Sequence, residues 1–457
     1  MIMSNPTHSE QFAQLCEAFE HARVKLRIPG ASLGVLMQGE YFTAGFGVTN
    51  ADHPLPVTPD TLFQIGSITK TFVGSLAMRL VEKGVLDLDA PIVRMLPNFA
   101  LADVAATQGA TVRHCLTHTG GWLGDWFNDC GEGDDAITRI VGEMAQLEQL
   151  TPLGEKWSYN NVGFALAARV CEQLTGKTFE QLLQDEIFTP LNLRHTFIFP
   201  NDVMTHRFAV GHHVTPEAAL VARPWQLGRA SHPPGGIIST VGDLLSYAQT
   251  HMGAGGAGFL SPDSLRHMQT PALAATGLYE MGLTWWVGQA TSGAFVEHGG
   301  ATNGQIALLR LVPSHGFAVA ILSNAGVGRA LTAELGHLAM QIFLGEGMPD
   351  SPLTPAQPAL AEYCGHYVSR LNEINVSEKD GKLWLTVRAL GRFPRPDSPP
   401  PPPPLDVSPP LEVGFYAPDR LVDANATTFG ARGEFVRDAA GAVVWLRWGG
   451  RLLRRVK

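Results

Sequence analysis

Residues 63–72 of this 457-residue chain read Phe63-Gln-Ile-Gly-Ser-Ile-Thr-Lys-Thr-Phe72, in which Ser67 and Lys70 stand three positions apart. The residues that follow, up to Gly84, have the apolar spacing of an amphipathic helix ended by glycine. On such a helix the two side chains share one face. A serine hydroxyl becomes a good nucleophile when a base takes its proton, and a buried lysine can supply an uncharged amine. Taken alone, the tetrapeptide fits a solvated helix N-terminus better.

Two further segments change that interpretation. The segment Trp157-Ser-Tyr-Asn-Asn-Val-Gly-Phe164 places Tyr159 and Asn161 before a helical stretch, and Glu297-His-Gly-Gly-Ala-Thr-Asn-Gly304 precedes a strand-like run. A tyrosine with a depressed pKa can exchange a proton with the serine or with the leaving group. A glycine pair lets a substrate backbone approach closely, and the next amide can donate to an oxyanion. Each segment alone fits a core aromatic residue or a turn histidine, but three in this order indicate one catalytic constellation.

The constellation resembles that of the serine β-lactamase and penicillin-binding-protein superfamily. The similarity is greatest to the branch of class C β-lactamases, D-stereospecific peptidases and family VIII carboxylesterases. That branch carries the motifs S-x-x-K, Y-x-N and K-T-G or H-x-G, matched here by Ser67 and Lys70, Tyr159 and Asn161, and His298, Gly299 and Gly300. The segments 116–121 and 234–243 are similar to two further segments of the branch.

The resemblance implies a two-step acyl transfer that needs no metal or cofactor. Ser67 would attack an ester or amide carbonyl while Lys70 and Tyr159 share its proton. The backbone amides of Ser67 and Ala301 would hold the oxyanion, and Asn161 would position Lys70 and the acyl part of the substrate. Water would then release the acyl group, activated by Tyr159.

The third motif bears on the substrate. His298 stands where many β-lactamases and DD-peptidases have a lysine, and a histidine binds a carboxylate as a cation only when it is protonated. His298 would instead orient the leaving group or polarise Tyr159. We therefore expect an esterase, D-aminopeptidase or amidase acting on a small molecule or peptide. A true class C-type β-lactamase or DD-peptidase is the alternative among enzymes, and a non-catalytic penicillin-binding or scaffold protein is the alternative outside them.

A second serine motif has to be weighed against this one. Gly30-Ala-Ser-Leu-Gly34 has the G-x-S-x-G form of the nucleophile elbow of α/β-hydrolases. The elbow requires a strand, a sharp turn and then a helix, with the serine exposed between them. Here a helical stretch and a turn come first and strand-like residues follow, so Ser32 is predicted to lie in the first strand of a sheet.

The predicted fold class is α+β. The resemblance implies an antiparallel sheet flanked by helices, with a mostly helical insertion at about residues 60–250 that supplies Ser67, Lys70 and Tyr159 to a cleft. The strands of this sheet are expected near residues 31–36, 40–48, 294–298, 305–312 and 316–323. One helix is expected before these strands, near residues 10–23, and another after them, near residues 332–344. The second helix closes the back of the sheet.

The composition changes after Gly345, which indicates two domains. We expect residues 1–346 to form the hydrolase domain and 347–358 a proline-rich linker. Residues 359–457 are expected to form a small barrel that resembles the lipocalin-like domain appended to many members of the branch. An Asp-Gly turn at residues 380–381 between alternating segments predicts a β-hairpin there. The six prolines at 399–404 predict an exposed polyproline II loop.

Charge and composition exclude several classes of protein. The net charge of −9 leaves no basic stripe for nucleic acid, and no run of lysine and arginine suggests a membrane surface. No segment approaches the roughly 18 apolar residues of a transmembrane helix. The N-terminus has no signal-peptide pattern and the five cysteines are scattered, so we expect a cytoplasmic protein. The sequence leaves the oligomeric state open, with a homo-oligomer as one option.

Metal and nucleotide sites are not indicated either. The 16 histidines include no H-E-x-x-H motif, and the pair His212-His213 is expected to face solvent. The chain also has no P-loop and no G-x-G-x-x-G followed by the expected acidic residue.

Overall fold

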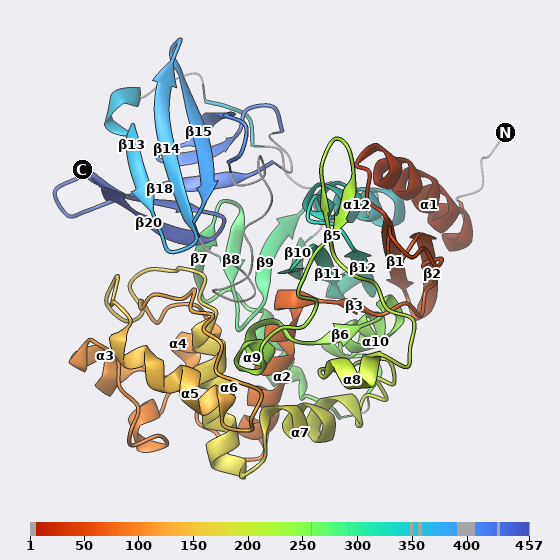
Figure 1. Cartoon of the computed structure of the whole chain (residues 1–457), viewed down its shortest axis with the longest axis horizontal. Coiled ribbons are helices and arrows are strands. Elements are labelled where there is room, and N and C mark those ends of the chain that lie inside the picture. Colours follow the sequence, from red (N-terminus) through yellow and green to blue (C-terminus); the bar gives the residue numbers. More distant parts are fainter. Residues whose placement is uncertain are drawn as a thin grey trace.

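The computed structural model describes residues 6–256, 258–291, 293–347, 351–354, 359–390, 407–426 and 430–456. Figure 1 shows a body built from a β-sheet and helices, and a β-barrel beside one end of that sheet. The main sheet has the order β2-β1-β12-β11-β10-β9-β8-β7. Its strands are β1 (Gly30–Met37), β2 (Glu40–Gly47), β7 (Leu273–Thr276), β8 (Tyr279–Met281), β9 (Trp286–Ala290), β10 (Gly293–Thr302), β11 (Gln305–Val312) and β12 (Phe317–Ser323).

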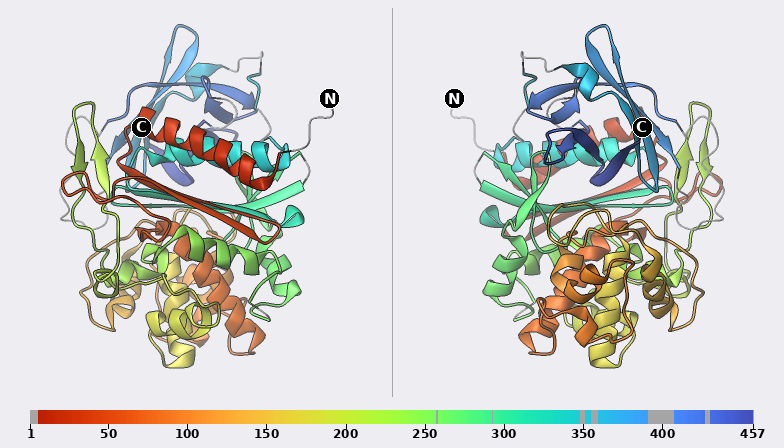
Figure 2. Two further views of the ribbon diagram at one scale, coloured as in Figure 1. Left: turned by 90° about the vertical axis from the view of Figure 1, so that its right-hand side faces the viewer. Right: turned by 90° about the vertical axis from the view of Figure 1, so that its left-hand side faces the viewer.

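The central strands are mostly apolar because both faces of the sheet are covered. Every residue of β1, β11 and β12 is buried. On one face lie α1 (His8–Lys25) and α12 (Gly328–Leu344), and on the other lies the helical lobe (Figure 2). Helix α1 begins at a capping box in which Thr7 and Glu10 each satisfy a backbone amide of the other.

The lobe is built from short helices around one apolar core. Its helices are α2 (Thr69–Glu82), α3 (Val104–Gly109), α4 (Val112–Leu116), α5 (Ala136–Gly142), α6 (Val162–Thr175), α7 (Phe179–Leu183), α8 (Pro200–Val203), α9 (His232–Gly235), α10 (Val241–His251) and α11 (Pro262–Gln269). Two small two-stranded sheets accompany them, formed by β3 (Phe63–Gln64) with β6 (Ile238–Ser239) and by β4 (His212–Val214) with β5 (Ala219–Val221).

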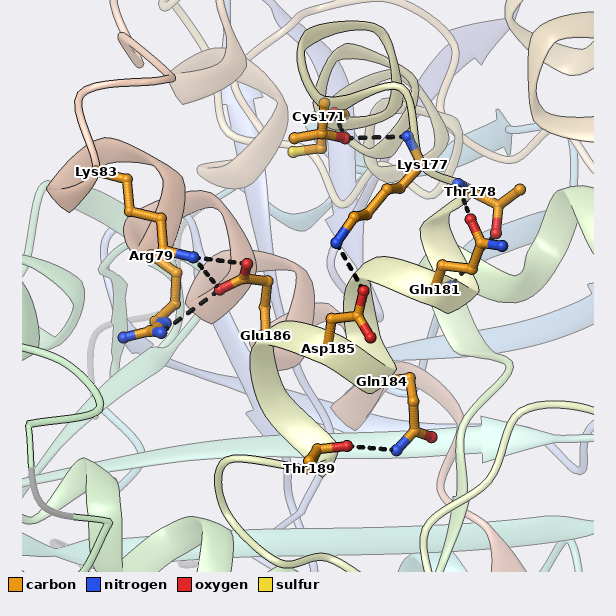
Figure 3. A network of polar contacts seen from close by, with 11 residues as sticks. Arg79, Lys83, Cys171, Lys177, Thr178, Gln181, Gln184, Asp185, Glu186 and Thr189 are labelled. Carbon is orange, nitrogen blue, oxygen red and sulfur yellow. Dashed lines mark hydrogen bonds and ion pairs between the residues drawn. The ribbon is translucent and has the colours of Figure 1, made fainter.

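Ion pairs tie the far end of α2 to the segment after α7, away from the sheet. Glu186 accepts from Lys83 at 2.6 Å and pairs with Arg79 at 3.5 Å (Figure 3). The neighbouring Asp185 accepts from Lys177 at 2.7 Å. The Glu186 contacts hold the C-terminal end of α2, whose first residues are buried.

The second domain is a closed antiparallel barrel in which each strand pairs with the next and β13 pairs with β20. Its strands are β13 (Gly365–Val368), β14 (Asn372–Lys379), β15 (Lys382–Ala389), β16 (Leu411–Ala417), β17 (Arg420–Asp423), β18 (Arg432–Arg437), β19 (Val443–Trp448) and β20 (Arg451–Val456). Asp380 and Gly381 both have positive φ angles in the turn between β14 and β15, as a two-residue hairpin requires.

The structure confirms the predicted fold class and the appended barrel. All five expected strands lie in the main sheet, whereas β7, β8 and β9 were not anticipated because they are short and have no clear alternation. The polyproline prediction at 399–404 falls outside the described residues. The domain limits 1–346, 347–358 and 359–457 stay predictions.

Two smaller expectations have opposite outcomes. Ser32 lies in β1 and is fully buried, as predicted, so the G-x-S-x-G segment is not a nucleophile elbow. The expectation that His212 faces solvent is wrong, because its ring is buried between the backbone amide of Ala51 and the carbonyl oxygen of Asn324. Across the described residues, no helix is long and apolar enough to span a membrane.

Candidate active site

Ser67 lies in a single 3₁₀ turn, Gly66–Ile68, that leads directly into α2. Gly66 has a φ angle of 52°, and a Cβ atom there would lie 2.5 Å from the backbone nitrogen of Ala301. Glycine is therefore required by the backbone conformation and by the approach of β10. The same turn presents the Ser67 side chain to a cleft between the sheet and the lobe.

Lys70 is fully buried one turn further along the chain. Its Nζ lies 3.1 Å from Ser67 Oγ and 2.7 Å from both Asn161 Oδ1 and the carbonyl oxygen of Pro234. Burial, with a further contribution from Arg451, holds the pKa of Lys70 well below that of an ordinary lysine. A lysine held in this way can lose its proton and accept the proton of the serine hydroxyl.

Tyr159 lies across the cleft from Lys70 and is also buried. Its ring lies 4.8 Å from Lys70 Nζ, and its hydroxyl shares a hydrogen bond with Ser67. Burial raises the pKa of Tyr159 above its ordinary value, against the opposing effects of Arg451 and the Ser67 bond. The expected depressed pKa is therefore wrong, and Tyr159 is a neutral phenol that can pass a proton only by donating one as it accepts another.

Asn161 is the N-cap residue of α6 and links Lys70 to a carboxylate. Its Oδ1 accepts from Lys70, and its Nδ2 donates to Asp125 Oδ1 at 2.6 Å. Asp125 is buried in the lobe and also accepts from Arg451 of β20, at 3.2 Å from its Nε. Neither Asp125 nor Arg451 was anticipated, because no motif marks them and the two lie 326 positions apart in the chain.

The third motif forms the sheet wall of the cleft. Strand β9 pairs with β10 only as far as Glu297, so residues 298–302 are paired on one side alone, with β11. A Cβ atom at Gly300 would lie 1.8 Å from the carbonyl oxygen of Ile65 and 3.2 Å from the backbone nitrogen of Ser67. This close approach brings the amides of Ser67 and Ala301 together at the same end of the cleft, where an oxyanion hole needs two donors.

His298 faces the cleft as a neutral ring. Burial, reinforced by Lys70, lowers its pKa to about 3. Its Nδ1 lies 2.6 Å from the carbonyl oxygen of Gly299 and donates to it, which leaves Nε2 as an acceptor. Among the described residues Nε2 has no hydrogen-bond partner although it is buried. The side chain therefore presents a lone pair, not a positive charge, to whatever occupies the cleft.

A second histidine supports Tyr159 from behind. His118 is fully buried and stacks on the Tyr159 ring with centroids 4.4 Å apart. Its Nδ1 accepts from the backbone nitrogen of Asn160 at 2.9 Å. Burial holds the pKa of His118 well below its usual value, so this ring is also uncharged. The loop that holds it, residues 116–121, was noted in the sequence only for its similarity to the branch.

The cleft has a volume of about 630 Å³ and is lined by the lobe, the sheet, helix α12 and the barrel. The lobe contributes Phe127, Leu227 and Ser231, and the sheet contributes His298 to Thr302. The barrel contributes Leu371, Gly430, Arg432, Gly449, Gly450 and Arg451. Within the described parts of the chain, no three His, Cys, Asp or Glu side chains gather closely enough to hold a metal ion.

The residues matched to the three motifs thus meet around one cleft. All eight predicted site residues lie there, from three separate parts of the chain: Ser67, Lys70, Tyr159, Asn161, His298, Gly299, Gly300 and Ala301. A buried amine beside a serine hydroxyl, with two backbone amides at the sheet edge, defines the class of serine acyl-transfer folds to which β-lactamases and penicillin-binding proteins belong.

Comparison with known proteins agrees, and the chain belongs to the β-lactamase family, whose pattern matches residues 15–341. Penicillin-binding protein 4 of Amycolatopsis lactamdurans is 32% identical over 360 residues, covering 75% of this chain and 93% of that protein. The crystal structure of SurE is 25% identical, with a TM-score of 0.77, and covers 98% of this chain and all of that one. A class C β-lactamase solved with cefoxitin is 20% identical, with a TM-score of 0.63, covering 73% of this chain and 99% of its own.

These findings confirm the predicted family and fold. The family pattern ends at residue 341, before the first barrel strand at Gly365, whereas the SurE structure aligns with nearly the whole chain.

Proposed function

We propose that the protein is a serine hydrolase that forms an acyl-enzyme on Ser67 and cleaves esters or amides. The observation that carries the proposal is the buried Lys70 amine, 3.1 Å from Ser67 Oγ and with a strongly lowered pKa. Keeping an ammonium group away from water is costly, and a purely structural role would not favour this position for a lysine. A base matched to the serine hydroxyl accounts for it.

The geometry supports one path for the proton. As Ser67 Oγ bonds to the carbonyl carbon, its proton passes to Lys70, and the carbonyl electrons move to an oxygen held by the amides of Ser67 and Ala301. The tetrahedral intermediate collapses, the bond to the leaving group breaks, and the proton reaches the leaving group through the Tyr159 hydroxyl. Water then attacks the acyl carbon, and its proton passes through Tyr159 to Lys70. The bond between the acyl carbon and Ser67 Oγ breaks, Lys70 returns the proton to Oγ, and the acid leaves, which restores Ser67.

The neutral His298 favours some substrates over others. A β-lactam or a peptide C-terminus presents a carboxylate, which a cation binds well and a nitrogen lone pair repels. A leaving group with an N–H or O–H donor would instead satisfy the unpartnered Nε2. We therefore propose that esters, amides and peptides with a free amine are better substrates than β-lactams.

A D-configured amino acid is the first acyl or amine component to test. The SurE structure has also been solved with D-Leu, and in that form it is 26% identical with a TM-score of 0.74 over 98% of this chain. This supports a D-aminopeptidase or D-amidase activity for this chain. β-Lactamase and DD-peptidase activities remain the alternative, since relatives carry the names β-lactamase and penicillin-binding protein.

The test compares wild type with Ser67→Ala on a short-chain p-nitrophenyl ester, followed by D- and L-amino-acid p-nitroanilides and penicillin. Hydrolysis by wild type and none by Ser67→Ala supports the proposal, and mass spectrometry should show the acyl group on the peptide that contains Ser67. Equal activity in both proteins would overturn it. If both are silent toward the whole panel and penicillin does not label Ser67, a non-catalytic scaffold is the better account.

A further inference from the structure

The hairpin β19–β20 carries the barrel into the active site. Trp448 pairs with Arg451 across a two-residue turn, Gly449-Gly450, in which both φ angles are positive. The turn lines the cleft. A Cβ atom at Gly450 would lie 3.2 Å from the Trp157 ring and 3.5 Å from Cβ of Tyr159, so the turn sits directly on the segment that holds the catalytic tyrosine.

Three consecutive residues of that segment are hydrogen-bonded to the hairpin. Arg447 Nε donates to the carbonyl oxygen of Trp157 at 3.2 Å, and the amide of Leu452 donates to Ser158 Oγ at 3.2 Å. The amide of Tyr159 donates to the carbonyl oxygen of Gly450 at 2.8 Å. The backbone around Tyr159 therefore takes its position from the barrel as well as from the lobe.

Arg451 extends this contact to the catalytic side chains. Its guanidinium lies 4.6 Å from the centre of the Tyr159 ring. The same group donates to both oxygens of Asp125, from Nε at 3.2 Å and from the second amino group at 3.3 Å. Asp125 accepts from Asn161, and Asn161 accepts from Lys70. One continuous chain of polar contacts thus runs from the barrel to the amine beside Ser67.

We propose that Arg451 is a positioning residue of the hydrolase site, and that the barrel is for this reason a working part of the active site in this protein. Arg451 holds the Asp125 carboxylate against Nδ2 of Asn161, so that Asn161 keeps Oδ1 toward Lys70. This inference rests on the proposed function, since it concerns the same site.

The physical reason lies in the two ends of an amide group. The oxygen and nitrogen of Asn161 are nearly the same size, and only the partners decide which of them faces Lys70. If Asp125 moved, the Asn161 amide could turn so that Nδ2 faces Lys70. Nδ2 is a hydrogen-bond donor and cannot accept the N–H that Lys70 now donates to Oδ1. Without Arg451, the buried Asp125 would also lose its ion-pair partner, which is costly and favours its displacement.

The charges around Lys70 determine what a variant should do to the pH profile. Tyr159 is neutral, and burial keeps His118 and His298 uncharged. Helix α9 contributes the carbonyl oxygen of Pro234, and beyond it Arg229 pairs with Glu180 and Asp134, while His232 is hydrogen-bonded to Glu180. Arg329 of α12 is a further cation that faces Tyr159 and Arg451. Arg451 lowers the pKa of Lys70 and Asp125 raises it.

The experiment measures kcat/KM against pH for the full-length protein on the ester that wild type hydrolyses. Arg451→Gln should lower kcat/KM by about 10- to 100-fold, because misplaced catalytic groups typically cost this much. It should also move the acidic limb of the profile to higher pH, since Lys70 loses a neighbouring cation. Asp125→Asn should lower kcat/KM similarly but move the acidic limb to lower pH. Arg451→Lys keeps the positive charge but cannot donate to both oxygens of Asp125 at once. It should therefore leave the acidic limb in place and have a kcat/KM between those of Arg451→Gln and wild type.

The matched control is Arg454→Gln. Arg454 lies on the same strand, makes a separate ion pair with Glu148 of the lobe at 2.8 Å, and is half exposed. This variant should keep the wild-type profile. Thermal unfolding of each variant separates misfolding from misplacement, and if Arg451→Gln does not fold, the near-isosteric Asp125→Asn carries the test.

Two results would overturn the inference. The first is a wild-type kcat/KM in folded Arg451→Gln or Asp125→Asn protein. The second is a shift of the acidic limb in the same direction in both variants. Either result would show that the contact between Arg451 and Asp125 is only structural. In both cases loss of activity in Ser67→Ala would leave the proposed function standing. Retained activity in Ser67→Ala would instead remove the proposed function itself.

Discussion

Three acceptors surround the Lys70 amine, and they explain both its position and its chemistry. Asn161 Oδ1, the Pro234 carbonyl oxygen and Ser67 Oγ can take all three protons of an ammonium group. The fully buried position nevertheless disfavours the charge. The side chain therefore stays oriented in either protonation state and can exchange a proton with Ser67 without moving.

The Tyr159 hydroxyl is the proposed proton relay between Lys70 and the leaving group. We expect Tyr159→Phe to lower kcat/KM by about 10²- to 10⁴-fold, because the proton path to the leaving group loses its relay. The ring contacts with His118 and Trp286 should persist, so the unfolding temperature should change little. Steady-state kinetics on the ester, with single-turnover acylation measured separately, check this. Full turnover by the phenylalanine variant would contradict the relay role.

The sequence anticipated these residues well because their motifs are local. Ser67 and Lys70 are neighbours on one turn, and Tyr159 and Asn161 are two positions apart, so short-range geometry brings each pair together. Their protonation states could not be predicted in the same way. Burial decides them, and burial depends on the residues that the fold packs around each group.

At the scale of elements, the junction of α6 and α7 contains a buried acid. Glu172 accepts from the backbone amide of Phe179, the first residue of α7, at 3.0 Å, and its nearest cation, Arg169, is 3.8 Å away. Burial outweighs both contacts and raises the pKa of Glu172 to about 7. The carboxyl group thus joins two helices and stays protonated at mildly acidic pH.

The raised pKa of Glu172 predicts that the free energy of unfolding decreases as the pH rises. The folded state holds the proton up to about pH 7, whereas an unfolded glutamate releases it near pH 4.5, so stability falls as the pH rises through that window. Glu172→Gln does not titrate and keeps an oxygen for the Phe179 amide. Its free energy of unfolding relative to wild type should increase by about 1–3 kcal/mol between pH 5 and pH 8. Urea unfolding at both pH values checks this, and an unchanged difference would contradict it.

At the scale of the whole molecule, the barrel and the lobe share one interface at the cleft. Arg370 of the barrel lies 4.0 Å from the Trp126 ring of the lobe, beside the hydrogen bonds of the β19–β20 hairpin. Figure 1 shows the barrel standing over β7, β8 and β9 and above the α3–α6 part of the lobe. The appended domain therefore restricts the cleft on one side.

The two turn glycines allow this interface to be probed by a matched pair of variants. Gly449 and Gly450 have φ angles of 54° and 80°, so alanine strains the backbone at either position, by about 1–2 kcal/mol. A Cβ atom at Gly449 meets open space, but one at Gly450 presses on Trp157. Gly450→Ala should therefore lose more stability and, unlike Gly449→Ala, lower kcat/KM. Equal effects of the two variants on activity would contradict a coupling between the turn and Tyr159.

By itself the sequence determined the family, the sheet, the appended barrel and the motif residues. These follow from short-range spacing and from apolar runs, which reflect local geometry and burial on one or two faces. Only the tertiary structure decided that the barrel enters the cleft, that Arg451 meets Asp125, and that His298 and Tyr159 are neutral. Such pairings join residues hundreds of positions apart, and the electrostatic environment of a side chain exists only once the whole chain has packed around it.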